Sequence, residues 1–110
     1  MRNYHHFVQD IITACEKIVR FVENMDFEQF SKDEKTVDAV IRNLEIIGEA
    51  TRKIPDSVKE RYNNIDWPAI IGMRNIIIHE YFGVDLEEIW KTIKEDIPAL
   101  KLSVKKLLSN

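Results

Sequence analysis

The chain has 110 residues, of which 45% are hydrophobic and 32% charged, a composition typical of one globular domain and not of a disordered or fibrous chain. Sixteen Lys and Arg against 19 Asp and Glu give a net charge of −3, so any nucleic-acid contact requires a local basic patch. A single cysteine excludes an intrachain disulfide, no signal-peptide pattern opens the chain, and no apolar run reaches the roughly 18–20 residues of a membrane helix. We therefore expect one cytoplasmic helical domain over residues 1–110.

The first predicted element is a long amphipathic helix over residues 4–25. Apolar side chains recur there at spacings of three and four residues, which places them on one face of a helix. The members of this set are Phe7, Ile11, Ala14, Cys15, Ile18, Phe21, Val22 and Met25.

A second helix is predicted to begin at Ser31, because Ser31 followed by Glu34 has the spacing of a capping box. It should end by Lys53, since Pro55 disfavours helical geometry at the residue before it. Residues 54–66 are expected to form a connection with a short helical turn over residues 57–62.

The third helix is predicted to begin after Asp66, a favourable N-cap, and to run from Trp67 to about Tyr81 before Gly83. Both tryptophans, Trp67 and Trp90, are expected to serve in helix packing and not as platforms that stack on bases.

The last helix is predicted to begin at Asp85, which with Glu88 has capping-box spacing, and to run over residues 86–108 with a kink where Pro98 removes a hydrogen bond. Its apolar residues fall within an arc of roughly 100°. They are Leu86, Ile89, Trp90, Ile93, Ile97, Leu100, Val104 and Leu107. A strip of lysines lies beside the arc and is interpreted as a solvated face unless the fold places it beside Arg74: Lys91, Lys94, Lys101 and Lys105.

Together these elements predict an all-α fold, an antiparallel bundle of four main helices plus one short helix. We expect no metal and no cofactor. His5 and His6 are adjacent, so on a helix they diverge by about 100°, and Cys15 belongs to the apolar stripe. The three glycines are isolated, so no phosphate-binding loop is present.

The unusual segment is residues 72–82. On a helical wheel, Arg74 and Tyr81 nearly superpose, and Asn75 and His79 share a neighbouring stripe beside Ile71 and Ile78. A histidine can exchange protons near neutral pH, and an arginine suits a phosphate or the charge that develops on phosphorus. Tyrosine can stack on a base, and an asparagine amide can orient a phosphate. These groups fit RNA cleavage in which the 2′-hydroxyl attacks and His79 acts as the general base.

A structural interpretation of the same residues stays open. An arginine and a histidine near a helix end can cap carbonyls or pair with nearby acids, among them Glu80, Asp85 and Glu87.

The spacing of Arg74, His79 and Tyr81, with four residues between the first two and one between the last two, resembles the motif of HEPN ribonucleases. The resemblance is closest to the HepT-like toxin family and spans nearly the whole chain. The further matching segments are residues 36–42, 44–50, 65–67, 72–75, 79–82 and the Trp90…Asp96-Ile97-Pro98 tail.

This resemblance implies a homodimer whose two motif helices line one cleft. It also implies a metal-independent endoribonuclease that acts on RNA as the toxin of a type VII-like toxin–antitoxin pair. The implied antitoxin is a minimal nucleotidyltransferase that adenylylates Tyr81, whose hydroxyl should then be accessible. Arg74 and His79 are the implied catalytic pair, and Asn75 is an assisting or phosphate-binding group. Two alternatives remain: a non-catalytic module that binds nucleotide or partner, and a dimeric structural protein.

Overall fold

The computed structural model describes residues 4–72 and 85–108. These residues form helices without any strand, which confirms the predicted all-α class. The elements in chain order are α1 (Tyr4–Phe21), α2 (Phe27–Lys32), α3 (Glu34–Lys53), α4 (Asp56–Arg61), a helical segment at residues 67–72, α6 (Leu86–Lys91), the π-helical segment η2 (Thr92–Asp96) and α7 (Ile97–Leu108).

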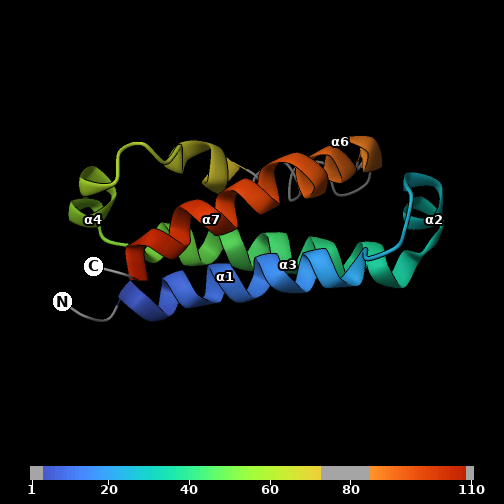
Figure 1. Cartoon of the computed structure of the whole chain (residues 1–110), viewed down its shortest axis with the longest axis horizontal. Coiled ribbons are helices and arrows are strands. Elements are labelled where there is room, and N and C mark those ends of the chain that lie inside the picture. Colours follow the sequence, from blue (N-terminus) through green and yellow to red (C-terminus); the bar gives the residue numbers. More distant parts are fainter. Residues whose placement is uncertain (1–3, 73–84, 109–110) are drawn as a thin grey trace.

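Helix α1 organises the bundle, because it packs against both α3 and α7 (Figure 1). Both neighbours run antiparallel to it. Helix α4 lies at the end of the bundle where α1 begins and α7 ends, whereas α2 and α6 lie at the opposite end. The antiparallel arrangement predicted from the short connections is therefore present in the described residues.

The core is mainly aliphatic and follows the predicted stripes. More residues of α1 are buried than the apolar periodicity predicts, because α3 and α7 cover this helix on two sides. Val8 and Ile12 are buried together with Ile11 and Ile18. All members of the apolar arc of the last helical track are buried or half-buried, as predicted. The largest fully buried side chains are Phe30, Ile11, Ile18, Leu44, Ile47, Ile54, Ile93, Ile97 and Leu107.

The first helix is shorter than predicted, because it ends at Phe21 and not at Met25. Asn24 has a φ of 66°, which is the left-handed region that asparagine tolerates better than most residues. The backbone N–H of Met25 donates to the Val22 carbonyl at 3.0 Å and closes this turn.

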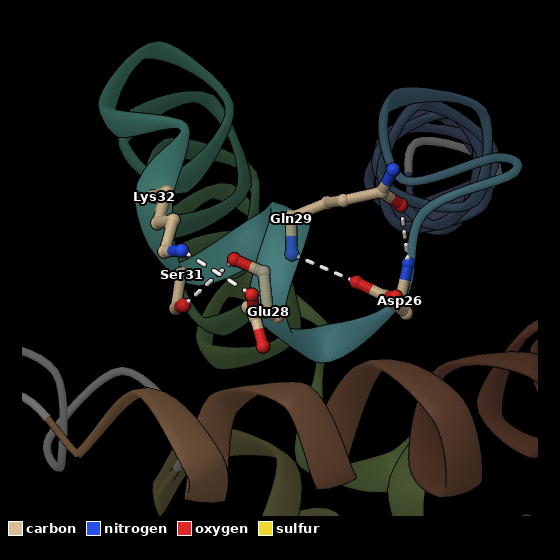
Figure 2. Close-up of polar contacts among 5 residues, drawn as sticks. All are labelled: Asp26, Glu28, Gln29, Ser31 and Lys32. Carbon is tan, nitrogen blue, oxygen red and sulfur yellow. Dashed lines mark hydrogen bonds and ion pairs between the residues drawn. The ribbon is translucent and has the colours of Figure 1, made fainter.

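The prediction that Ser31 caps the second long helix is wrong. Ser31 lies inside the short helix α2, where its hydroxyl donates to the Glu28 carbonyl at 2.9 Å (Figure 2). The N-cap of α3 is Asp33, whose carboxylate accepts from the Thr36 backbone N–H at 3.1 Å. That hydrogen bond is the main reason why the pKa of the Asp33 carboxyl is lowered.

The capping box lies five residues earlier than expected. Asp26 accepts from the Gln29 backbone N–H at 2.8 Å, and the Gln29 side chain accepts from the Asp26 backbone N–H at 2.9 Å (Figure 2). This reciprocal pair satisfies two donors at the start of α2. Helix α2 therefore begins at Phe27, after the end of α1 at Phe21, and it carries the buried Phe30.

Three other boundaries agree with the sequence. Helix α3 ends at Lys53, with Ile54 extended before Pro55. Helix α4 occupies the predicted short turn. The final track is helical from Leu86 to Leu108, and the irregularity near Pro98 is a π-helical turn in which the Ile97 N–H donates to the Thr92 carbonyl. A wider turn just before a proline accommodates a residue that lacks an N–H and whose ring needs space.

Candidate active site

The four residues predicted to form the site, Arg74, Asn75, His79 and Tyr81, lie outside the described residues, as does the predicted helix end at Gly83. The structure describes the segments on either side of them. Residues 66–72 lead into the motif, and Asp85 begins the helix that follows it. These two segments show how firmly the chain is anchored at each end of the motif.

The upstream anchor is Trp67. Its side chain is buried, and its indole N–H lies 3.2 Å from the carbonyl oxygens of both Lys59 and Tyr62, so that it donates to the end of α4. Asp66 accepts from the Ala69 backbone N–H at 3.1 Å, as expected of an N-cap. Ile70 is buried one turn later. The helix that leads into the motif is thus fixed at its first turn, and the prediction of a packing role for Trp67 is confirmed.

We expect Trp67→Phe to lower the free energy of unfolding by about 1–3 kcal/mol. The ring would still fill most of the site, but the Lys59 and Tyr62 carbonyls would lose the indole N–H as a donor, although the Tyr62 carbonyl keeps the Ile65 backbone N–H. Chemical denaturation measures the change, and Trp90→Phe is the matched control, because no hydrogen bond from the Trp90 indole supports α4. Equal loss in the two variants would show that indole packing, and not the hydrogen bond, matters at Trp67.

The downstream anchor is α6. The Asp85 carboxylate accepts from the backbone N–H groups of Glu87 and Glu88 at 3.0 and 3.2 Å, which confirms the predicted N-cap. Trp90 is half-buried, with its ring centroid 5.1 Å from that of Phe30 and 6.3 Å from that of Phe27. Trp90 therefore joins α6 to α2 and serves in helix packing, as predicted.

The lysine strip is largely a solvated face. Lys91, Lys94 and Lys105 are exposed, whereas Lys101 forms an ion pair with Glu16 of α1 at 3.3 Å. The Lys94 ammonium lies 5.2 Å from the centroid of the Trp90 ring, a cation–π distance. Because Arg74 lies outside the described residues, the idea that this strip flanks the motif stays a prediction.

Within residues 4–72 and 85–108, no group of three or more His, Cys, Asp or Glu residues is placed to hold a metal ion. His6 is exposed, and His5 is half-buried with its ring edge-on to Tyr4 at 4.5 Å. Cys15 is fully buried, and burial raises the pKa of its thiol to about 12. A thiol that stays protonated at neutral pH is a poor nucleophile.

We expect the folded protein to resist thiol reagents at pH 8 and to react only after denaturant is added. The Cys15 thiolate is the reactive form, and with a pKa of about 12 it is scarce at that pH. Titration with a chromogenic disulfide measures the reaction. Rapid labelling of the native protein would contradict this assignment of Cys15 to the core.

One surface feature was missed by the sequence reasoning. A groove of about 280 Å³ lies between the end of α1 and the η2–α7 junction. Its lining is partly apolar and partly charged, and consists of Val19, Val22, Glu23, Asn24, Ile93, Lys94 and Pro98. The only sequence signal was Val19, an aliphatic residue outside the predicted apolar stripe of the first helix.

Comparisons with known proteins place this helical chain among the ribonucleases. A family model described as ribonuclease HepT-like matches residues 11–107. A probable ribonuclease HepT of Thermococcus cleftensis is 47% identical over 106 residues, which cover 96% of each chain. A putative RNase of Caldanaerobacter subterraneus is 40% identical over 108 residues, which cover 98% of this chain and 96% of that relative. A putative RNase of Methanocaldococcus jannaschii is 40% identical over 94% of each chain.

The chain belongs to the ribonuclease HepT-like family. Membership confirms the predicted resemblance and the predicted enzyme class, a ribonuclease. No solved structure gives a significant match. In the part of the chain that the structure describes, no helix is long and apolar enough to cross a membrane.

Proposed function

We propose that this chain is a metal-independent endoribonuclease whose catalytic pair is Arg74 and His79. The observation that carries the proposal is the Arg74–His79–Tyr81 spacing, which falls inside the segment matched by the ribonuclease family model. The names of the relatives, all given as ribonucleases, support the same activity. Asn75 assists by orienting the phosphate through its amide.

The reaction follows from the chemistry of these side chains. His79 removes the proton of a ribose 2′-hydroxyl, and the 2′-oxygen attacks the adjacent phosphorus. The bond from phosphorus to the 5′-oxygen breaks, and the leaving oxygen takes up a proton from water, to which His79 returns its own proton. Arg74 stabilises the negative charge that develops on the non-bridging oxygens. The products are a 2′,3′-cyclic phosphate and a 5′-hydroxyl end.

Purified protein and a labelled RNA test this proposal. Cleavage that continues in excess EDTA and leaves 2′,3′-cyclic phosphate ends is expected, since the nucleophile and the base come from the substrate and from His79. Cleavage that stops in EDTA and returns with a divalent cation would contradict metal independence. Binding of RNA or nucleotide without cleavage would favour a non-catalytic module.

We propose further that two copies pair through the motif helix, so that the two motifs share one cleft. The isoleucines beside the motif, Ile71 and Ile78, supply an apolar strip for that contact, and Ile71 is half-buried in the single chain. Ile78→Asp is expected to weaken this pairing, because an unpaired charge would enter a desolvated contact. Light scattering measures the mass, and an unchanged mass would rule out this interface.

The biological role that we propose is that of a cytoplasmic toxin in a toxin–antitoxin pair. The antitoxin is a minimal nucleotidyltransferase that transfers AMP to the Tyr81 hydroxyl, with release of pyrophosphate from ATP. The phosphodiester that links Tyr81 to AMP would lie next to the catalytic pair. It would occupy the site of the RNA phosphate and accept hydrogen bonds from the Arg74 guanidinium. The enzyme would be blocked by charge and by bulk at once.

A further inference from the structure

The segment that leads into the motif is held at its first turn. Residues 67–72 are helical and lie along the bundle between α4 and α6 (Figure 1). Trp67 and Ile70 are buried, whereas a Cβ added at Gly72 would meet no described atom within 4 Å. The closely packed end of this segment is therefore the Trp67 end, and not the end at which the chain passes into the motif.

The Trp67 indole links this segment to a different helix. The Asp66 carboxylate accepts from the Ala69 backbone N–H at 3.1 Å, but this hydrogen bond stays within one turn. The indole N–H instead reaches the carbonyls of Lys59 and Tyr62, each at 3.2 Å, at the end of α4. The direction of the segment is thus coupled to the position of α4.

Helix α4 gives the indole a fixed support. Val58 in this helix and Ile54 just before it are buried in the core. Lys59 belongs to the last turn of α4, where carbonyls have no intrahelical donor. The Tyr62 carbonyl also accepts from the Ile65 backbone N–H at 3.1 Å. The Lys59 carbonyl is therefore the acceptor that gains most from the indole.

A small change of direction at Trp67 becomes a displacement at Arg74. In the helix predicted from Trp67 to about Tyr81, the rise is about 1.5 Å per residue, so Arg74 would lie about 10 Å beyond Trp67. A tilt of about 6° at the first turn would then shift Arg74 by about 1 Å. A misplacement of about 1 Å can lower a catalytic rate about 10²-fold.

We propose that Trp67 is a positioning residue of the ribonuclease site. Its indole N–H, bound to the end of α4, fixes the direction in which the chain delivers Arg74. This role goes beyond the stability that Trp67 supplies to the fold, and it rests on the ribonuclease function proposed above.

The first test compares the cleavage kinetics of wild type, Trp67→Phe and Ile11→Val at a temperature at which circular dichroism shows all three to be folded. Trp67→Phe is expected to lower kcat by about 10- to 100-fold and to leave KM within about twofold, because the groups that bind RNA are retained but misaligned. Ile11→Val is the control for stability, since it removes one buried methyl group from α1 and should leave both constants unchanged.

A wild-type kcat in Trp67→Phe would overturn the positioning role. Absence of cleavage by the wild type would instead overturn the ribonuclease function, and the positioning role with it.

A second variant removes the donor and keeps the shape of the side chain. In Trp67→benzothienylalanine a sulfur atom replaces the indole N–H, while both fused rings remain. This variant should lower kcat as Trp67→Phe does. A wild-type kcat here, together with a low kcat in Trp67→Phe, would overturn the assignment to the N–H and leave the size of the ring as the cause.

Amide hydrogen exchange supplies a readout that does not depend on cleavage. In Trp67→benzothienylalanine, the backbone amides of Ala69 and Ile70 should exchange at least about tenfold faster than in the wild type, because the first turn opens more often. Amides in the middle of α1 should be accelerated much less. Equal acceleration in α1 and at Ala69 and Ile70 would overturn the proposal, since the indole would then support the whole fold and not the direction of this segment.

Discussion

His79→Ala is expected to lower the rate of RNA cleavage by about 10²- to 10⁴-fold, the usual contribution of a positioned general base. Cys15 is buried with its thiol protonated, and His6 lies exposed on α1 in another part of the sequence. Initial rates on a short labelled RNA, measured with and without EDTA, give the comparison.

The matched control is His6→Ala, which removes an exposed imidazole and should leave the rate unchanged. The melting temperature of His79→Ala decides between a catalytic and a structural role. A stable protein without activity supports catalysis. A large drop in melting temperature, with activity lost in proportion to unfolded protein, would show that the histidine caps or pairs within the fold.

Adenylylation of Tyr81 is expected to abolish cleavage. A minimal nucleotidyltransferase and ATP should add one AMP to the wild type, seen by mass spectrometry, and none to Tyr81→Phe. The unmodified Tyr81→Phe protein should keep its rate within about tenfold, because it loses one hydroxyl hydrogen bond of about 0.5–1.5 kcal/mol and keeps the ring. It should also continue to cleave RNA after treatment with the transferase.

Tyr62 offers the control for this experiment, because it is half-buried at the end of α4. Tyr62→Phe should be labelled and inhibited like the wild type. Labelling that persists in Tyr81→Phe and disappears in Tyr62→Phe would show that the modified residue is Tyr62 and not Tyr81. Labelling at Tyr81 that leaves the cleavage rate unchanged would remove the proposed mechanism of neutralisation.

The parts of the fold that could be predicted from the sequence are those set by local chemistry. Pro55 acts on the residue before it, so the end of α3 at Lys53 follows from two adjacent residues. The Asp85 cap and the buried arc of the last helical track likewise depend on spacing along one segment. The arc survives the π-helical turn because the sequence keeps its apolar phase on both sides of Pro98.

The boundary between α2 and α3 could not be chosen from spacing alone. Ser31 and Asp33 are both good N-cap residues, and each has a partner three residues on, Glu34 and Thr36. In the structure Ser31 is inside α2, and the cap is Asp33. The end of α1 was missed for a related reason. The apolar repeat continues through Val22 and Met25, but the chain turns at the left-handed Asn24, before Met25 is reached.

For the candidate site, the sequence supplies residue types and order, whereas the structure supplies the anchors at both ends of the motif. Trp67 was predicted to pack in the core, but its hydrogen bonds to the Lys59 and Tyr62 carbonyls depend on where α4 ends. The groove beside Val19 arises from the way α1 meets the η2–α7 junction, which no single segment determines. The roles of Arg74, Asn75, His79 and Tyr81 stay predictions.

The most direct test of the central claim is bacterial growth after induction of wild type and of His79→Ala, each with and without a cognate minimal nucleotidyltransferase. We predict arrest by the wild type without the transferase, relief of that arrest by the transferase, and normal growth with His79→Ala in both conditions. Equal arrest by wild type and His79→Ala would contradict a toxin that acts through this histidine.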